Sequence, residues 1–402
     1  MGSLAVSRAG QVVYSRSFGA ARLAPAAPNT AATRLRVGSI TKMFTATMIF
    51  QLIEERKLML TTSLATFFPQ LPNARAITIG QLLSHRSGLH NFTSDPAFAT
   101  YMTQPKTQAE LLAIMTLPKP DFAPGAKYAY SNTNYELLGF IVEKLSKMPY
   151  AQALQKRVVA RAGLPSTYYG GPLAAQPLEA HSYFSDGRGG WQPGPESDMS
   201  IPGGAGAAVS TPTDLNHFLE SLFGGRLVSA TSLAEMKNMR DGYGHGLMLL
   251  PFGTRQSVGH GGVIDNFVAF ASYFPDEQLA VTLCTNGQQY SANEAMKGVL
   301  SICFNQPYKI PDFATSGYVP ATADLDRYAG TYATPKLPLK VTFSRDGTAL
   351  RSQATGQDAF NLEPVSAGVF KFEPAGIRVV FAPDAPTFTL EQGGGTFVFT
   401  KE

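Results

Sequence analysis

Cysteine, tryptophan and histidine are scarce in this chain, which has two Cys, one Trp and six His in 402 residues. Two cysteines make no disulfide framework, and we expect Cys284 and Cys303 to be buried free thiols, with a bridge between them as the alternative. The histidines are scattered and form no His-Glu-x-x-His pattern, and no Cys-x-x-Cys pair occurs. The sequence therefore predicts neither a metal site nor a cofactor.

Charge is also sparse, at 15% of residues, and the net charge is 33 − 29 = +4 without a long basic run. This gives no support to nucleic-acid binding. No apolar stretch reaches the ~18–20 residues of a membrane span. The longest candidate, residues 43–52, contains threonine and glutamine and is typical of a core helix. An apolar content of 44% fits a globular enzyme with a substantial core.

Several hydrolase and nucleotide motifs are missing. The chain has no Gly-x-Ser-x-Gly, which argues against the nucleophile elbow of α/β-hydrolases. It has no Ser-Asp-Asn and no Lys-Thr-Gly, which argues against a class A β-lactamase. It also lacks any Gly-Lys pair, which excludes a Walker phosphate loop.

One Ser-x-x-Lys is present, Ser39-Ile40-Thr41-Lys42, at the start of an apolar, helix-like run over residues 40–58. Residues three apart share a helix face, so Lys42 should lie beside the Ser39 hydroxyl. A desolvated lysine can take the proton of a serine and so make it a nucleophile. An ordinary helix cap is the alternative for Ser39 alone.

Two further patterns follow in the chain, and each occurs once. Tyr130-Ser131-Asn132 precedes a predicted helix over residues 134–147, and His260-Gly261-Gly262 lies between predicted strands. An ordinary helix-capping turn and a tight glycine turn with an exposed histidine are the structural alternatives for these two patterns.

The three motifs, in this order, resemble those of the class C β-lactamase family of serine penicillin-recognising enzymes, which also holds D-alanyl-D-alanine carboxypeptidases and β-lactamase-like esterases. The segment Leu82-Leu83-Ser84-His85-Arg86-Ser87-Gly88-Leu89 is similar to the family's "LLxHxSGL", and the small-residue segment from Pro202-Gly203-Gly204 is similar as well. Matches run from about residue 11 to residue 286.

We expect Ser39 to be the acyl-accepting nucleophile and Lys42 its base. Tyr130 should share the proton transfer, with its pKa lowered by Lys42 and His260. Asn132 should hold Lys42 and donate to a substrate carbonyl, and His260 should bind Tyr130 or a substrate carboxylate. Gly261 and Gly262 should let the substrate approach the backbone closely. The resemblance implies an oxyanion hole made by the N–H groups of Ser39 and Val263.

Other residues near the motifs have less defined roles. His85 is expected to be structural, hydrogen-bonding a loop. Asp265 and Asn266 line the pocket or form a surface turn. His260 replaces the lysine that many relatives carry at this place, which disfavours a carboxylate-bearing β-lactam as the preferred substrate.

The strand and helix patterns divide the chain. Strands are predicted over residues 4–17, with a turn at Ala9-Gly10 and alternation that suits a half-buried surface, and again at 246–250, 257–259, 267–274 and 279–285. Helices are predicted between them at residues 40–58, 79–85, 108–116, 134–147, 150–162 and 213–222, and after them at 292–304. We therefore expect an α+β fold of the β-lactamase/transpeptidase-like α/β sandwich type. Its antiparallel sheet is formed by both ends of the domain and is flanked by helices and a helical subdomain.

The sequence pattern changes near the C-terminus. Residues 306–322 contain three prolines and are expected to form a linker between a catalytic domain, 1–305, and a small domain, 323–402. Short strand-like runs at 339–343, 370–373, 377–382, 387–390 and 396–400 predict a small antiparallel β-barrel or sandwich. Residues 325–332 resemble the start of a lipocalin-like domain. A packing or lid module is favoured over a ligand-binding barrel.

The predicted function is a serine acyl hydrolase with an acyl-enzyme on Ser39. D-Ala-D-Ala carboxypeptidase or D-amino-acid peptidase activity is favoured, carboxylesterase activity is the alternative, and β-lactamase activity ranks third. A non-catalytic binding protein is the rival from another class. The expected partner is a small acyl substrate, a D-amino-acid peptide, ester or β-lactam. Neither nucleic acid nor a transmembrane segment is expected, and the oligomeric state is left open. The resemblance favours a periplasmic or secreted location over the cytoplasm, and the chain shows no signal peptide.

Overall fold

The computed structural model describes residues 1–173, 178–186, 190–308, 310, 318–335, 337, 339–355, 359–372, 375–383, 385–392 and 395–402. It divides into two compact units, which are described separately. Unit 1 comprises Met1–Phe184 and Pro193–Gly287, and unit 2 comprises Ser185–Gln192 and Gln288–Glu402. Much of the predicted linker, residues 309 and 311–317, lies outside the described residues.

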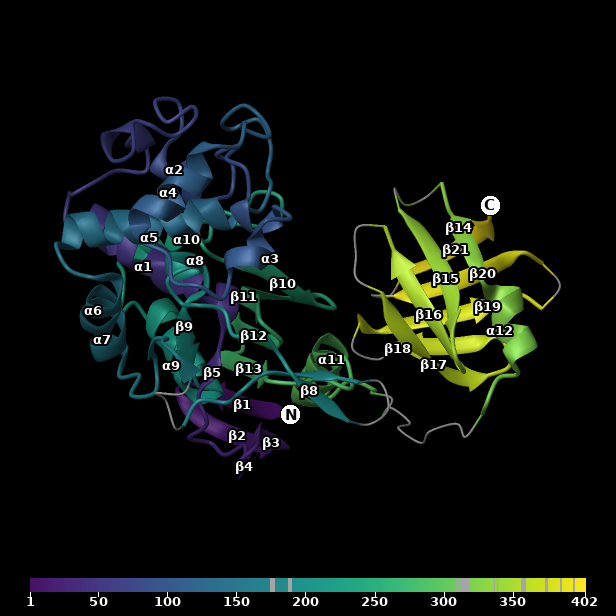
Figure 1. Ribbon diagram of the computed structural model, residues 1–402. Helices are drawn as coiled ribbons and strands as arrows, with labels where there is room; N and C mark the ends of the chain where they lie inside the picture. Colours follow the sequence, from purple (N-terminus) through teal and green to yellow (C-terminus); the bar gives the residue numbers. More distant parts are fainter. Residues whose placement is uncertain are drawn as a thin grey trace. The chain divides into compact units, whose positions relative to one another are not determined.

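A six-stranded antiparallel sheet forms the base of unit 1, in the order β10-β11-β12-β13-β1-β2 (Figure 1). The N-terminal strand β1 pairs with β13 along its whole length, from Gly2 opposite Thr285 to Arg8 opposite Leu279. The two ends of the unit therefore close the sheet, as the sequence predicts. The strands are β1 (Gly2–Arg8), β2 (Gln11–Phe18), β10 (Met248–Phe252), β11 (Arg255–Ile264), β12 (Phe267–Phe274) and β13 (Leu279–Thr285).

The two inner strands β12 and β13 have the predicted bounds, but two predictions for this sheet are wrong. The edge strand β2 is almost wholly exposed rather than half-buried, since it has a neighbour on one side only. The short strand predicted at 257–259 is ten residues long, and it includes His260, Gly261 and Gly262. At Gly262, the backbone of the segment that carries Val37 and Ser39 comes close to the strand.

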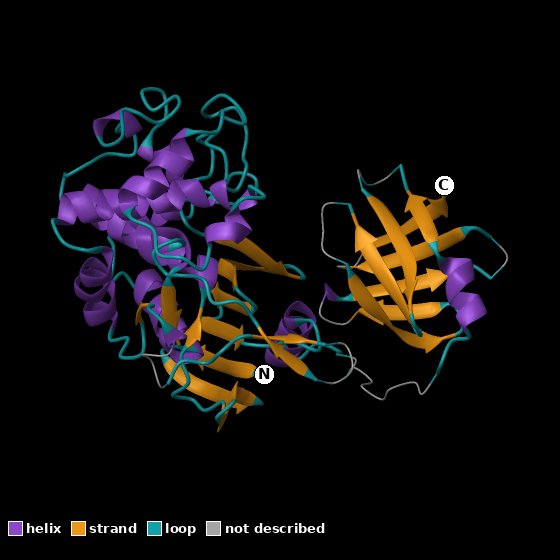
Figure 2. Ribbon diagram, in the orientation of Figure 1, coloured by secondary structure: helices purple, strands orange, loops and turns teal. Residues whose placement is uncertain are grey.

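Helices fill the rest of unit 1 (Figure 2). α9 packs against β1, β12 and β13, while α1, α2, α5 and α8 contact one another in the helical subdomain. The α-helices are α1 (Thr41–Glu54), α2 (Ile79–Leu83), α3 (Phe98–Tyr101), α4 (Gln108–Thr116), α5 (Asn132–Ser146), α6 (Tyr150–Leu154), α7 (Ala160–Ala162), α8 (Gly203–Gly206), α9 (Pro212–Phe223) and α10 (Ala230–Met236). A single-turn 3-10 helix, η1 (Gly38–Ile40), leads into α1, and a π-helical turn, η4 (Gln155–Val159), joins α6 to α7.

The helix α1 is central because its sequence is apolar all round. Twelve of its residues, Thr41 to Leu52, are buried, so it has no solvent face. It ends at Glu54, four residues before the predicted end at residue 58. The polar side chains inside it are threonines and Gln51, which donate to carbonyls, and Lys42.

Smaller strands complete unit 1. β5 (Leu35–Arg36) and β6 (Tyr168–Tyr169) pair on either side of β9 (Ala208–Ser210). β3 (Ala20–Leu23) and β4 (Ala26–Pro28) form a hairpin. A further pair, β7 (Tyr183–Ser185) and β8 (Trp191–Pro193), is not confined to unit 1, because Ser185, Trp191 and Gln192 belong to unit 2.

Unit 2 contains α11 (Ala292–Cys303), α12 (Thr322–Tyr328) and a closed eight-stranded barrel in chain order. The strands are β14 (Gly330–Ala333), β15 (Lys340–Asp346), β16 (Ala349–Ala354), β17 (Phe360–Ser366), β18 (Val369–Phe372), β19 (Ile377–Phe381), β20 (Thr387–Gln392) and β21 (Gly395–Lys401). The predicted barrel is confirmed. β14, β16 and β17 were not predicted, because their alternation of buried and exposed residues uses small or polar side chains.

Buried rings fill the barrel interior. Phe343 contacts Tyr332, Phe381 and Phe388 with ring centroids 5.0–5.5 Å apart. The two cysteines are not joined by a disulfide, and Cys284 is buried while Cys303 is partly exposed. Among the described residues, no helix is long and apolar enough to cross a bilayer.

Candidate active site

The first two motifs meet at the start of α1. Ser39 lies in η1, and Lys42 lies in the first turn of α1, where its side chain is fully buried. The Lys42 Nζ atom is 3.0 Å from Ser39 Oγ and 2.8 Å from Asn132 Oδ1. It also lies 2.8 Å from the carbonyl oxygen of Ala205 in α8. The predicted contact between Ser39, Lys42 and Asn132 is therefore present.

The hydrogen-bond partners of Lys42 determine the direction in which its nitrogen can accept a proton. A backbone carbonyl only accepts, so one N–H must point at Ala205. The Asn132 amide is oriented because its Nδ2 donates to Thr93 Oγ1 over 2.9 Å, which leaves Oδ1 to accept from Lys42. A neutral amine has two N–H groups and one lone pair. With both N–H groups used, the lone pair faces the Ser39 hydroxyl.

Burial favours that neutral form. Desolvation lowers the pKa of Lys42 well below its usual value, and the nearby Glu136 carboxyl opposes the shift only in part. A lysine that is uncharged near neutral pH can accept a proton, which an exposed ammonium cannot do.

The prediction that the pKa of Tyr130 falls is wrong. Desolvation raises the pKa of the Tyr130 hydroxyl above its usual value, and a hydrogen bond with Ser39 offsets part of this rise. The Lys42 Nζ lies 4.9 Å from the centre of the Tyr130 ring, so the lysine sits over the ring rather than beside the hydroxyl. Tyr130 is therefore a protonated phenol that can donate.

His260 is buried in β11 and does not take the place the sequence suggested. Its Nε2 lies 3.1 Å from the hydroxyl of Tyr243, and its Nδ1 lies 2.5 Å from the carbonyl oxygen of Gly261. The carbonyl only accepts, so the proton is on Nδ1 and Nε2 accepts from Tyr243. Burial lowers the pKa of His260 to about 3. The exposed glycine-turn histidine is excluded, and the ring carries no charge for a carboxylate.

The two glycines after His260 have different surroundings. A Cβ on Gly262 would overlap the carbonyl oxygen of Val37 and lie 3.0 Å from the Ser39 nitrogen. Gly262 is thus required because β11 touches the turn that carries Ser39. At Gly261 a Cβ would make ordinary contacts of 3.7 Å or more. The same approach brings Val263 N to 2.9 Å from the place of a Cβ on Gly38.

His85 has the structural role that the sequence suggested. Its Nδ1 accepts from the N–H of Ser131 and from the Asn134 side chain, both over 3.2 Å. Its ring centroid lies 4.2 Å from that of Tyr130. His85 thus holds the segment that carries Tyr130 and Asn132.

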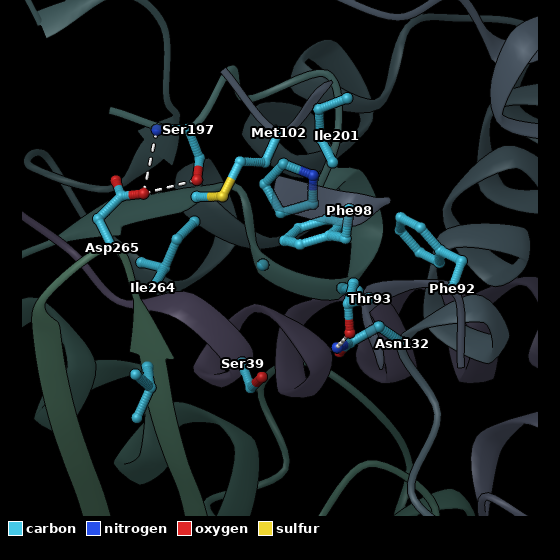
Figure 3. A pocket seen from close by; sticks show the side chains of 14 residues that line it. Ser39, Phe92, Thr93, Phe98, Met102, Asn132, Ser197, Ile201, Ile264 and Asp265 are labelled. Carbon is cyan, nitrogen blue, oxygen red and sulfur yellow. Dashed lines mark hydrogen bonds between the residues drawn. The ribbon is translucent and has the colours of Figure 1, made fainter. Parts of the chain in front are cut away.

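A pocket of about 260 Å³ opens above Ser39 (Figure 3). Asp265, left open by the sequence, lines it, whereas Asn266 donates to the carbonyl of Tyr183. The lining is mostly apolar, and the residues are Ser39, Phe92, Thr93, Phe98, Met102, Asn132, Ser197, Ile201, Pro202, Ala205, Gly206, Val263, Ile264 and Asp265.

The charge at the pocket wall is already paired. Asp265 accepts from Arg36 Nη1 over 3.0 Å and from Ser197 through both its N–H, at 3.0 Å, and its hydroxyl, at 2.5 Å. Neither Lys nor Arg is among the lining residues, and the described residues contain no cluster of metal-ligating side chains. Sequence reasoning missed Arg36, Thr93, Ser197, Ala205 and Tyr243, because single residues outside a motif carry no local signal.

Comparison with known proteins identifies the class. The family model described as "Beta-lactamase" matches residues 2–301, so the chain belongs to the beta-lactamase family. Within that family it is a serine hydrolase, as its relatives indicate.

Three proteins that are similar to this chain can be compared with it. Penicillin-binding protein 4* of Bacillus subtilis (strain 168) is 25% identical over 432 residues, covering 98% of this chain and 93% of that protein. The D-aminopeptidase of Brucella canis is 25% identical over 305 residues, covering 74% of this chain and 58% of that protein. The D-amino acid amidase of Ochrobactrum anthropi SV3, solved with L-phenylalanine amide, is 28% identical with a TM-score of 0.66, covering 75% of this chain and 93% of the amidase chain.

Proposed function

We propose that this protein hydrolyses amides or peptides of D-amino acids through an acyl-enzyme on Ser39. The observation that carries the proposal is the hydrogen bonding of Lys42. Two fixed acceptors, Asn132 Oδ1 and Ala205 O, take its N–H groups and leave the lone pair directed at Ser39 Oγ.

The residues present account for a balanced acylation. Ser39 Oγ attacks the substrate carbonyl carbon while its proton passes to Lys42 Nζ. The N–H groups of Ser39 and Val263 would stabilise the oxyanion. The carbon–nitrogen bond then breaks, and the leaving amine takes the proton that Lys42 accepted, while the Tyr130 phenol donates a hydrogen bond beside Ser39. In deacylation, water attacks the acyl carbon as it gives a proton to Lys42, and Lys42 returns this proton to Ser39 Oγ as the ester bond breaks.

The pocket supports the choice among substrates. The apolar residues that line the cavity suit an apolar side chain of the substrate beside the scissile bond. A carboxypeptidase must hold a free carboxylate, but His260 is buried and neutral and no Lys or Arg is among the lining residues. We therefore place D-amino-acid amidase or aminopeptidase activity above carboxypeptidase activity. The names of the related D-aminopeptidase and D-amino acid amidase support the same choice.

Carboxylesterase activity is the second candidate. The same relay would serve an ester, and an ester likewise brings no carboxylate into the pocket. β-Lactamase activity ranks third, since β-lactams carry a carboxylate.

The test is a substrate panel with Ser39→Ala as the control. D- and L-phenylalanine amide, a D-Ala-D-Ala peptide, p-nitrophenyl acetate and nitrocefin would each be assayed, and the acyl adduct located by mass spectrometry. We expect an adduct on Ser39 and turnover of the D-amide above its L-enantiomer. Turnover of esters alone would favour the second candidate. Undiminished turnover by Ser39→Ala would exclude the mechanism.

A further inference from the structure

A tight contact between α5 and α8 sets the position of one of the Lys42 partners. A Cβ on Gly204 would lie 2.6 Å from the Tyr135 carbonyl oxygen and 2.7 Å from Gly139 Cα. The two helices therefore touch backbone to backbone. The residue after Gly204 is Ala205, whose carbonyl accepts from Lys42. A small displacement of α8 would move this carbonyl away from the lysine.

The side chain of Glu136, in α5, lies beside the contact between α5 and α8. Glu136 follows Asn132 by one turn of α5, so both residues are on the same face of the helix. Its side chain is buried, 1% exposed, and its carboxyl fills the place where Gly203 would otherwise have a side chain. It accepts a hydrogen bond from the N–H of Gly204. Its Oε2 has no hydrogen-bond partner among the described residues.

The other side of the same peptide is held from α1. Thr45 Oγ1 donates to the carbonyl oxygen of Gly204 over 2.6 Å and is 2.5 Å from the Tyr150 hydroxyl. Gly204 is thus fixed by Glu136 at its nitrogen and by Thr45 at its oxygen. The motif residues Gly203 and Gly204, which the sequence marked without a role, are the surface that receives the Glu136 carboxyl.

We propose that Glu136 is a positioning residue for Lys42, holding Gly204 so that the Ala205 carbonyl stays within hydrogen-bond reach of the lysine. This inference rests on the proposed function, in which Lys42 is the base for Ser39.

The charge on Glu136 bears on the lysine as well. Burial raises the pKa of Glu136 well above its usual value, the charge of Glu143 adds to the rise, and that of Lys42 opposes it. Tyr150 and Tyr169 also face this carboxyl. A negative Glu136 raises the pKa of Lys42, so removing its charge should keep Lys42 neutral to a lower pH.

The experiment measures the rate of phosphonylation of Ser39 by a fluorophosphonate, in which the Oγ–P bond forms and fluoride leaves. The full chain would be compared as wild type, Glu136→Ala, Glu136→Gln and Glu179→Gln, from pH 5 to 10. Glu179 is the matched control because it is a buried carboxyl, 2% exposed, that also has an unpartnered Oε2. It lies outside the proposed machinery.

We expect Glu136→Ala to react about 100-fold more slowly, because a misplacement of about 1 Å has that effect on oriented groups. Glu136→Gln should keep the rate within about threefold at its optimum, since the amide preserves the shape and can accept from Gly204. Its acid limb should move to lower pH, because the charge of Glu136 raises the pKa of Lys42. Glu179→Gln should match wild type in rate and profile.

Two results would overturn the inference. One is a folded Glu136→Ala protein that reacts as fast as Glu179→Gln. The other is a Glu136→Gln protein slowed by as much as about 100-fold at its optimum, which decides the matter if the alanine variant does not fold, because the amide keeps the shape of the side chain. Failure of the proposed function itself would look different, because wild-type protein would then not be labelled on Ser39 or Ser39→Ala would be labelled equally.

Discussion

Arg36 and Asp265 form a buried ion pair at the wall of the pocket, with Nη1 and Oδ2 3.0 Å apart and both side chains 1% exposed. Arg36 comes from β5 and Asp265 follows β11, so the pair joins two segments more than 200 residues apart in the sequence. Asp265 also receives two hydrogen bonds from Ser197. The pair therefore fixes the pocket wall formed by the Ser197 segment.

Asp265→Ala should destabilise unit 1 by about 3 kcal/mol, because removing one partner leaves a buried charge uncompensated. Glu196 can pair with Arg36 only from an exposed position, with 45% of its side chain accessible. Without Asp265, the Ser197 segment of the pocket wall is no longer held in place. KM for the best substrate should therefore rise more than kcat falls, since Asp265 does not contact Ser39 or Lys42. Urea unfolding and steady-state kinetics would measure both effects.

Glu277→Gln is the control for this variant. Glu277 pairs with Arg255 at a partly exposed site, with 30% and 36% of the side chains accessible. Such a pair contributes under about 1 kcal/mol. Equal losses for the two variants would contradict the role given to Asp265.

His260 should make the protein less stable in acid. Its pKa in the folded protein is about 3, below the usual 6.5, so the unfolded chain binds a proton that the folded protein does not. Stability is therefore lost as pH falls from about 6.5 toward 3. From pH 7 to pH 5 this one group costs about 2 kcal/mol. His260→Gln should remove that part of the loss, measured as the difference in unfolding free energy between the two pH values.

His90 provides the control of opposite sign. A hydrogen bond with Asp121 raises its pKa, so it stabilises the fold at low pH, and this contribution fades as pH rises. His90→Gln should leave the acid loss at least as large as in wild type. A His260→Gln protein with the full wild-type acid loss would show that His260 is not the group responsible.

Thr93 sets the orientation of the Asn132 amide. Thr93→Val keeps the shape of the side chain but removes the acceptor of the Asn132 Nδ2 hydrogen bond. The amide can then rotate, and Lys42 loses its fixed partner for part of the time. We expect acylation of Ser39 to slow about five- to tenfold, equivalent to one ordinary hydrogen bond. Thr93→Ser should restore the rate.

Thr116→Val tests whether any lost threonine hydroxyl has this effect. Thr116 ends α4 and donates to the carbonyl of Leu112. Ser39 of the Thr116→Val variant should be acylated at the wild-type rate. If Ser39 of Thr93→Val is also acylated at the wild-type rate, the amide of Asn132 is held by other means.

Contacts between site residues could be predicted from the sequence where they depend on the spacing of residues within one helix. Contacts that depend on tertiary structure could not be predicted. Ser39 and Lys42 share a helix turn, so their contact follows from a spacing of three. The partners of His260 do not follow from sequence, because Tyr243 meets it only when β11 is in place. The pKa of Tyr130 was predicted with the wrong sign since charge was considered and burial was not.

The strands of the fold also differ in how well the sequence predicts them. The strand bounds of β12 and β13 could be read from continuous apolar runs, whereas β16 and β17 of the barrel have short, mixed patterns that a single sequence does not separate from loops. Ala205 illustrates the limit most simply, because its contribution is a backbone carbonyl that any residue would have.

The barrel offers a test of whether the small domain proposed from the sequence, residues 323–402, folds separately from unit 1. Phe343 is 2% exposed and contacts three other rings, so Phe343→Ala should destabilise the barrel by about 3–5 kcal/mol. If the units are independent, unit 1 should still unfold at the wild-type urea concentration, and Ser39 should be labelled at the wild-type rate. Val398→Ala, at a site 55% exposed on β21, should change neither property. A parallel loss of Ser39 labelling and unit 1 stability in Phe343→Ala would instead mean that the catalytic unit depends on the barrel, because independently folding units do not share the cost of a cavity.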